Sequence, residues 1–126
     1  LTILDDCYNA NPISTKASID VLDMAIGRKV AVLGNMGELG ANEKELHHET
    51  GAYAAEKGVD VVCAIGDLAK EIANGASVEG TEVHWFETKA DFLAEMKNIM
   101  KEGDNVLVKA SHGMHFPELV EALEAL

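Results

Sequence analysis

The residues best suited to chemistry stand near the start of the chain, where Asp5 and Asp6 follow a short apolar run, residues 1–4. Asn9 and Asn11 come soon after them. The run has the length and β-branched content of a buried strand, and open α/β sheets bind ligands just beyond the carboxyl ends of their strands. Two adjacent acids there suit Mg²⁺ or the hydroxyls of a ribose, and they also occur simply as turn formers. We therefore predict a ligand-facing turn at these four polar residues.

A second polar group follows the apolar run 105–109 near the other end of the chain. It contains Lys109, Ser111 and His112. Because parallel strands end at the same edge of a sheet, we expect Lys109 to lie near the two acids and to offset their charge. Ser111 offers a hydroxyl to a carboxylate or an amine, and His112 suits a substrate contact. No carboxylate or cysteine lies nearby at ligand spacing, so we predict no metal site in this loop.

Apolar runs alternate with helical patterns along the whole chain, and short loops separate them. This alternation predicts βαβ units and a mostly parallel sheet covered on both faces, which is an α/β, Rossmann-like three-layer α/β/α domain. A chain of 126 residues predicts one domain, 1–126. The expected strands are 1–4, 30–33, 59–65, 82–86 and 105–109, and the expected helices are 13–26, 42–57, 67–73, 88–100 and 116–126.

The helix boundaries carry their own predictions. Asn11 is a good N-cap for the first helix, and Asp67 is well placed to cap the short third one. In the first helix, helical spacing predicts that Val21, Leu22 and Ile26 belong to the buried face.

The loop after the second strand has glycines at 34, 37 and 40, which is the spacing of neither common phosphate-binding motif. Its pattern fits a flexible turn at least as well as a ligand contact. We therefore predict that this domain does not cradle a triphosphate by itself. His47 and His48 follow on a mostly polar helix, where adjacent positions point about 100° apart. They do not converge on one ion, and we predict a solvated helix face.

Composition narrows the class of protein. A net charge of −12 argues against a nucleic-acid surface, and no segment approaches the length of apolar sequence that crosses a membrane. Two cysteines, Cys7 and Cys63, suggest reduced thiols and a cytoplasmic setting, with Cys7 a packed small residue. The chain starts with Leu1 inside an apparent strand, so we expect it to be a piece of a longer protein.

A receiver-like phosphoacceptor domain is the alternative from the residues alone. Such domains have a similar length, an acidic pair after the first strand and a lysine after the fifth. Asp67 would then be the phosphoacceptor, although it follows a glycine and fits a helix cap. Lys109 is followed by Ala110, whereas the receiver pattern expects proline.

Three runs of sequence together resemble the Mur ligases, in particular the members that add D-alanyl-D-alanine. Residues 5–12 resemble the D-D-x-Y-N-A-N-P signature of those members. Residues 30–40, with His47 beyond them, resemble V-A-V-L-G-D-M-x-E-L-G…H, and residues 106–114 resemble V-L-V-K-G-S-R-x-M. The resemblance covers nearly the whole chain, and the motifs come in the same order. Another Mur ligase or a folylpolyglutamate-type ligase shares the domain plan and is the further alternative.

The resemblance implies the carboxy-terminal domain of a cytoplasmic, three-domain ligase, whose amino-terminal and central domains are missing here. Such an enzyme uses ATP and Mg²⁺ to join D-alanyl-D-alanine to UDP-N-acetylmuramoyl tripeptide in peptidoglycan synthesis. It forms an acyl phosphate on the tripeptide, which the dipeptide amine then attacks. The phosphate loop belongs to the central domain, so the isolated domain is expected to be inactive.

By the same resemblance, nucleotide-facing roles are expected for Asp5, Asp6, Asn9 and Asn11. Substrate-side roles, toward the dipeptide or the phosphoryl group, are expected for Asn35, Lys109, Ser111 and His112. No catalytic residue and no metal ligand are assigned within the domain. The chain departs from the pattern at Asn35, where aspartate is usual, at Ala110 for glycine and at His112 for arginine, which removes a bidentate anion contact.

Overall fold

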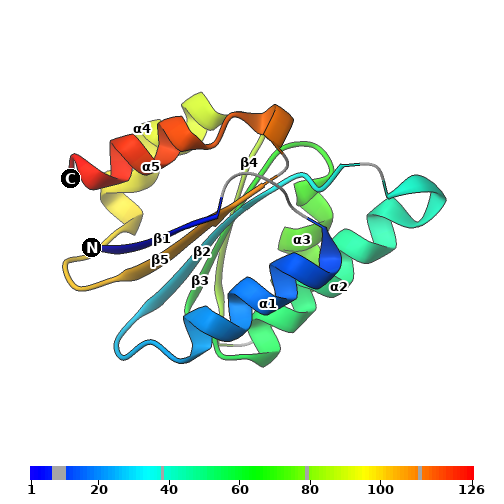
Figure 1. The fold of residues 1–126 in the computed structure, drawn as a ribbon, viewed down its shortest axis with the longest axis horizontal. Coiled ribbons are helices and arrows are strands. Elements are labelled where there is room, and N and C mark those ends of the chain that lie inside the picture. The colour runs from blue at the N-terminus through cyan, green and yellow to red at the C-terminus, as the bar shows by residue number, and fades with distance from the viewer. Residues whose placement is uncertain (7–10, 38, 79, 111) are drawn as a thin grey trace.

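A computed structural model describes the chain except residues 7–10, 38, 79 and 111, and for Asp6 and His112 it describes the backbone alone. One parallel sheet runs through the described part, in the strand order β1-β5-β2-β3-β4. Helices cover both of its faces (Figure 1), so the α/β, three-layer fold is confirmed. The elements are β1 (Thr2–Asp6), α1 (Pro12–Asp23), β2 (Lys29–Gly34), η1 (Gly40–Asn42), α2 (Glu43–Glu56), β3 (Val61–Ile65), α3 (Ala69–Ala76), β4 (Glu82–Phe86), α4 (Lys89–Ile99), β5 (Asn105–Lys109), η2 (His112–Met114) and α5 (Pro117–Glu124).

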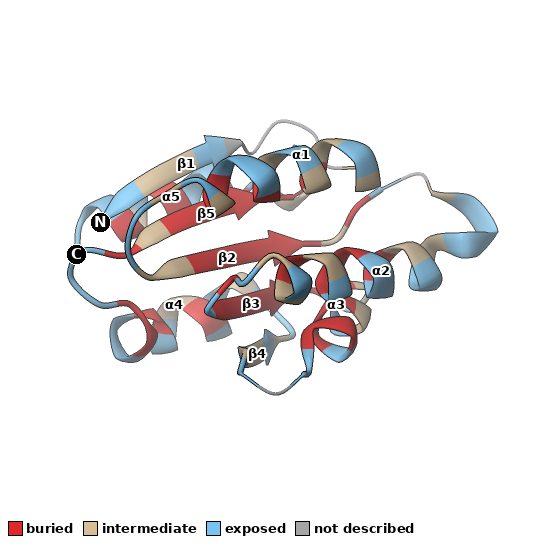
Figure 2. Ribbon diagram, turned by 90° about the horizontal axis from the view of Figure 1, so that it is seen from below, coloured by how far each residue is buried: buried red, intermediate tan, exposed pale blue. Residues whose placement is uncertain are grey.

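The three central strands are buried on both faces. β2, β3 and β5 are rich in valine and are buried over nearly their whole length, whereas the edge strands β1 and β4 are partly exposed (Figure 2). Continuous apolar runs of this kind are what a parallel sheet between two helical layers requires. One core lies between the sheet and α4 and α5, and the other between the sheet and α1, α2 and α3.

The first helix begins as predicted and ends earlier. The Asn11 side chain accepts the Ser14 N–H at 2.8 Å, and the Ser14 hydroxyl accepts the Asn11 N–H in return, which is a capping box. The predicted buried face is confirmed for Leu22, which has no exposed surface, and is wrong for Val21, which is 49% exposed, and for Ile26, which is 97% exposed. The helix ends at Asp23, before Ile26, and its core face is instead formed by Thr15, Ile19 and Leu22.

Helices α2 and α3 pack with their backbones in contact. A Cβ atom built on Gly51 of α2 would lie 1.9 Å from the carbonyl oxygen of Ile72, and one built on Gly75 of α3 would lie 2.0 Å from that of His48. The two glycines therefore let the helices approach more closely than any side chain allows. In the described residues, no helix is long and apolar enough to cross a membrane.

The sheet reverses its direction of winding at β5. α1, which follows β1, and α2, which follows β2, lie on one face, whereas α5, which follows β5, lies on the other (Figure 1). Because β5 stands between β1 and β2, the chain leaves β5 toward the opposite face of the sheet from the chain that leaves either neighbour. The carboxyl ends of these three strands therefore border the crevice where open α/β sheets bind ligands.

Candidate functional site

The crevice brings together the charged residues that the sequence placed at one edge of the sheet. In the strand register, Asp5 is opposite Val108 and Asp6 is opposite Lys109, and on its other side Lys109 pairs with Leu33 of β2. Asp5 is exposed, and Lys109 is 2% exposed. The predicted closeness of the acids to Lys109 is confirmed in the register of the sheet.

Three of the other predicted site residues have limited description. Asn9 and Ser111 lie outside the described residues, and for His112 the structure gives the backbone alone, as the first residue of η2. Their expected contacts with nucleotide or substrate therefore stay predictions. Asn11 is described, and its side-chain amide oxygen caps α1. Its expected role toward a nucleotide stays a prediction.

Asn35, at the end of β2, is held by the start of α3. Its Oδ1 accepts the Ala69 N–H at 2.8 Å, and its Nδ2 donates to the Asp67 carboxylate at 2.8 Å. The prediction that Asp67 caps the third helix is therefore corrected. The helix begins at Ala69, after Leu68, and the side chain that caps it comes from another loop. A substrate contact of Asn35 stays a prediction, and both ends of its amide carry hydrogen bonds in this structure.

These contacts shift the acidity of Asp67. The Asn35 amide and the Leu68 backbone N–H both stabilise the carboxylate and hold the pKa of Asp67 below its ordinary value. Close approach is possible because Gly66 has no side chain, since a Cβ atom there would lie 2.5 Å from the Asn35 Oδ1. Asn35, Gly66 and Asp67 thus join the ends of β2 and β3.

Replacing Asn35 by aspartate is expected to lower the free energy of unfolding by roughly 0.5–1 kcal/mol near pH 7, because it puts a second carboxylate against Asp67, whose exposure lets water screen part of the repulsion. One of the two carboxyls then has a raised pKa, so the folded variant binds more protons than its unfolded chain. The variant should regain stability as the pH falls from about 7 toward about 4, whereas the lowered pKa of Asp67 makes the parent lose stability. Urea denaturation midpoints across this range measure the two opposite slopes.

The control for this variant is a second substitution, Asp67→Asn, in the Asn35→Asp background. It exchanges amide and carboxylate and should recover most of the lost stability if the two residues interact directly. A variant whose stability has the same pH dependence as the parent would contradict the contact.

The loop after β2 is anchored on two further sides. The Met36 N–H donates to Nε2 of His47 at 2.9 Å, and the Thr15 hydroxyl lies 3.7 Å from the Met36 sulfur. His47 is completely buried, so the predicted solvated face is wrong for His47, although His48 is exposed. The loop after β2 was predicted to fit a flexible turn. Its first two residues, Asn35 and Met36, are instead held by contacts to α1, α2 and α3.

The loop after β5 rests on the end of β2. A Cβ atom on Gly34 would lie 2.7 Å from the Ala110 Cβ and 2.6 Å from the Phe116 ring, so both side chains fill the space that glycine leaves. Beyond them, His115 has a φ of 54°, in the left-handed region. Its carbonyl oxygen lies 3.4 Å from Nζ of Lys89.

No metal site or reactive thiol emerges from the described side chains. Among them, no group of three or more histidine, cysteine, aspartate or glutamate residues could hold a metal ion. Burial raises the pKa of the Cys63 thiol to about 12, which keeps it protonated.

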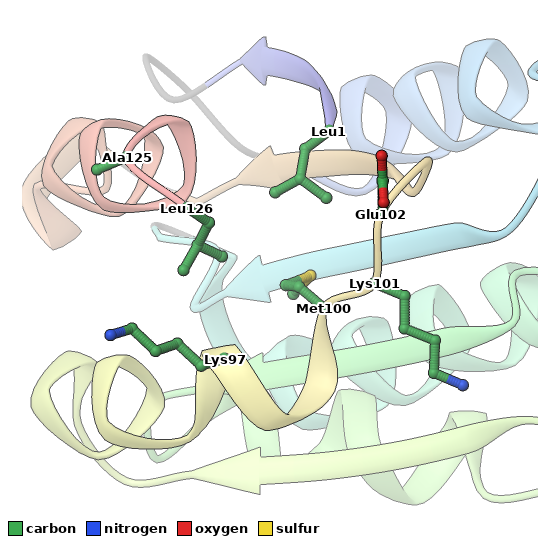
Figure 3. Close-up of a pocket in the computed structure, with 7 residues that line it drawn as sticks. All are labelled: Leu1, Lys97, Met100, Lys101, Glu102, Ala125 and Leu126. Atoms are coloured by element: carbon green, nitrogen blue, oxygen red, sulfur yellow. The ribbon is translucent and has the colours of Figure 1, made fainter.

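Two hollows lie outside the carboxyl-end crevice between β5 and β2. A cavity of about 650 Å³ opens at the amino ends of the strands, where Leu1, Met100 and Leu126 converge (Figure 3). A smaller groove of about 340 Å³ lies between β1 and α1, and its lining includes Leu4, Asp5 and Val21. We place the site by topology and charge, because ligands of open α/β sheets bind at the carboxyl ends.

The comparisons with known proteins identify the family. The chain matches the family model described as Mur ligase, glutamate ligase domain, over residues 1–112. The chain belongs to the Mur ligase family. The family match leaves no ground for a receiver domain.

The relatives of this Mur ligase domain share one name. It is 39% identical over 127 residues to the UDP-N-acetylmuramoyl-tripeptide–D-alanyl-D-alanine ligase of Bacillus subtilis, with 98% of this chain and 28% of that protein covered. It is 33% identical to the Escherichia coli enzyme of the same name, with 97% and 26% covered. The chain thus spans little more than a quarter of these curated relatives.

Solved structures give the same result. MurF from Acinetobacter baumannii matches with a TM-score of 0.89 at 34% identity, over 98% of this chain and 28% of that one. MurF ligase from Thermotoga maritima, solved in complex with ADP, matches with a TM-score of 0.80 at 30% identity, over 98% and 28%. The Mur ligase domain therefore has the fold of part of these enzymes.

Proposed function

We propose that this Mur ligase domain, residues 1–126, is the carboxy-terminal part of a cytoplasmic ATP-dependent ligase that joins D-alanyl-D-alanine to UDP-N-acetylmuramoyl tripeptide. The observation that carries the proposal is that Asp5 and Asp6, at the end of β1, pair with Val108 and Lys109, at the end of β5, beside the crevice of the sheet. It is supported by the relatives, which bear the name of this ligase at up to 39% identity over nearly the whole chain.

The chemistry of such a ligase has two transfers. The terminal carboxylate of the tripeptide takes the γ-phosphoryl group of ATP, which releases ADP and leaves an acyl phosphate. The dipeptide amine then attacks the acyl carbon, and the tetrahedral intermediate expels inorganic phosphate to form the amide. Both steps develop negative charge on oxygen, which fixed cations and N–H donors stabilise.

Within this scheme the domain supplies binding and orientation. Asp5 and Asp6, with Asn9 and Asn11 behind them, would face the nucleotide and accept hydrogen bonds from ribose hydroxyls. Mg²⁺, when bound, would balance phosphate charge. Among the described residues, no cluster of three or more histidine, cysteine, aspartate or glutamate side chains could hold it.

On the other side of the crevice, Lys109 would stand near the phosphoryl group or the incoming dipeptide. Ser111 and His112 follow it in the sequence, and Asn35 follows β2, the strand that pairs with β5. The sequence of this domain contains no phosphate loop, so the missing amino-terminal and central domains would supply the rest of the ATP site.

The test uses the full-length protein that contains this chain. With ATP, Mg²⁺ and UDP-N-acetylmuramoyl tripeptide, ADP release should depend on D-alanyl-D-alanine and should yield the extended peptide. L-glutamate in place of the dipeptide should give no product, which separates this ligase from glutamate-adding members of the family. Product with glutamate instead would overturn the proposal. The 126-residue chain alone should show no turnover.

A further inference from the structure

His47 makes two hydrogen bonds from inside the protein. It lies on α2 with no exposed surface. Its Nε2 is 2.9 Å from the Met36 backbone nitrogen, and its Nδ1 is 2.5 Å from the Glu43 carbonyl oxygen one turn earlier. The imidazole therefore joins the body of α2 to the loop that follows β2.

The partners determine which nitrogen carries the proton. A backbone N–H can only donate, so Nε2 must accept from Met36, and a carbonyl oxygen can only accept, so Nδ1 must carry the hydrogen. Both bonds exist together only in the neutral Nδ1–H form of His47. A protonated imidazole has no acceptor for Met36, and an apolar side chain has none either.

The loop held by His47 supports the crevice. Met36 is buried, and its side chain lies against Thr15 of α1. Two residues earlier, Gly34 lies directly under Ala110 and Phe116, which flank the loop after β5. A displacement of the β2 loop would therefore be passed to the segment that follows Lys109.

We propose that His47 is a positioning residue, which fixes the start of the β2 loop through the Met36 N–H and thereby sets the positions of Ala110 and Phe116, which follow Lys109 in the sequence. The proposal rests on the proposed ligase function for its kinetic consequence. Its structural part, the anchoring of Met36, is independent of the reaction.

Two substitutions separate the hydrogen bond from the volume of the ring. In His47→Gln, the side-chain carbonyl reaches close to the place of Nε2 and retains an acceptor. In His47→Leu, the site stays filled and the acceptor is lost. His48→Leu is the matched control, because His48 is the next residue of the same helix and is exposed.

Hydrogen–deuterium exchange of the full-length protein directly measures the protection that His47 gives to the Met36 N–H. In His47→Leu, the peptide that contains Met36 should exchange about ten-fold faster or more, because a buried N–H loses its partner. Peptides from α4 should be unchanged. His47→Gln and His48→Leu should resemble the parent, and glutamine rescue is a result that a purely space-filling role would not produce.

Steady-state kinetics of the same variants measure how loss of the hydrogen bond to Met36 affects the reaction in the crevice. In His47→Leu, kcat/KM for the dipeptide should fall about ten-fold, since small displacements of a positioning element cost this much or more. Unchanged exchange at Met36, or equal effects of leucine and glutamine, would overturn the proposal. If the parent protein has no ligase activity, the proposed function fails, and the exchange result alone decides whether His47 anchors the loop.

Discussion

Replacing Gly75 by alanine is expected to destabilise the fold by about 3 kcal/mol or more, which is at the upper end of overpacking effects. In most helices this change stabilises by roughly 0.5–1 kcal/mol, because glycine has more freedom to lose on folding. Here the added methyl group would lie 2.0 Å from the His48 carbonyl oxygen and 3.0 Å from the Ala52 nitrogen. The contact is with backbone, which cannot rotate away, so α2 and α3 would have to separate.

Chemical denaturation of the chain measures the loss of stability. Two further substitutions test whether that loss comes from the contact between α2 and α3. Gly51→Ala should cost as much, because its Cβ would lie 1.9 Å from the Ile72 carbonyl oxygen. Gly113→Ala should be near neutral, since no atom of the described residues beyond its chain neighbours lies within 4 Å of a Cβ built there. A stabilised Gly75→Ala variant would show that the two helices are not in backbone contact.

The strands could be predicted closely from the sequence, whereas the contact between α2 and α3 could not. The strand β5 was predicted with its observed limits, because a run of valine and leucine bounded by polar residues has only one reasonable interpretation as a buried strand. Gly51 and Gly75 stand inside helices, where glycine carries no information about its neighbours. Their meaning depends on a partner helix, and sequence spacing does not supply that partner.

The residues of the candidate site also fall into two groups, those that the sequence could place and those that it could not. Asp5, Asp6 and Lys109 could be assigned to one edge, because the carboxyl ends of parallel strands always meet there. The structural roles of Asn35 and His47 were missed, since each is defined by a residue on another element, Ala69 for the first and Met36 for the second.

A weak signal for the burial of His47 was present. His47 is three residues before Thr50, four before Gly51 and seven before Ala54, and these are the buried positions of α2. The rest of the helix is so polar that these buried positions are hard to distinguish, from the sequence, from positions that face solvent. Ile26 shows the opposite error, because an apolar residue in helical register stayed outside a helix that ended three residues earlier.

Replacing Lys109 by methionine in the full-length protein is expected to lower kcat/KM for the dipeptide by at least about 100-fold, as loss of one fixed donor commonly does. Lys109 is nearly fully buried between the ends of β1 and β2. Its charge is therefore little screened by water, and in the proposed ligase it faces negative charge that develops in both steps. Methionine fills a similar volume, so the change removes charge without opening a cavity.

Lys101→Met is the matched control for that experiment. It removes the same charge at the opposite edge of the sheet, where Lys101 lines the cavity at the amino ends of the strands (Figure 3). Its kcat/KM should stay within about two-fold of the parent, because exposed charges at that distance are screened by salt. Thermal midpoints of both variants, measured beside the kinetics, separate lost catalysis from lost folding. If Lys101→Met slows the reaction as much as Lys109→Met, the loss of rate is due to the changed net charge of the domain. That result would contradict the assignment of the site to the crevice at β5.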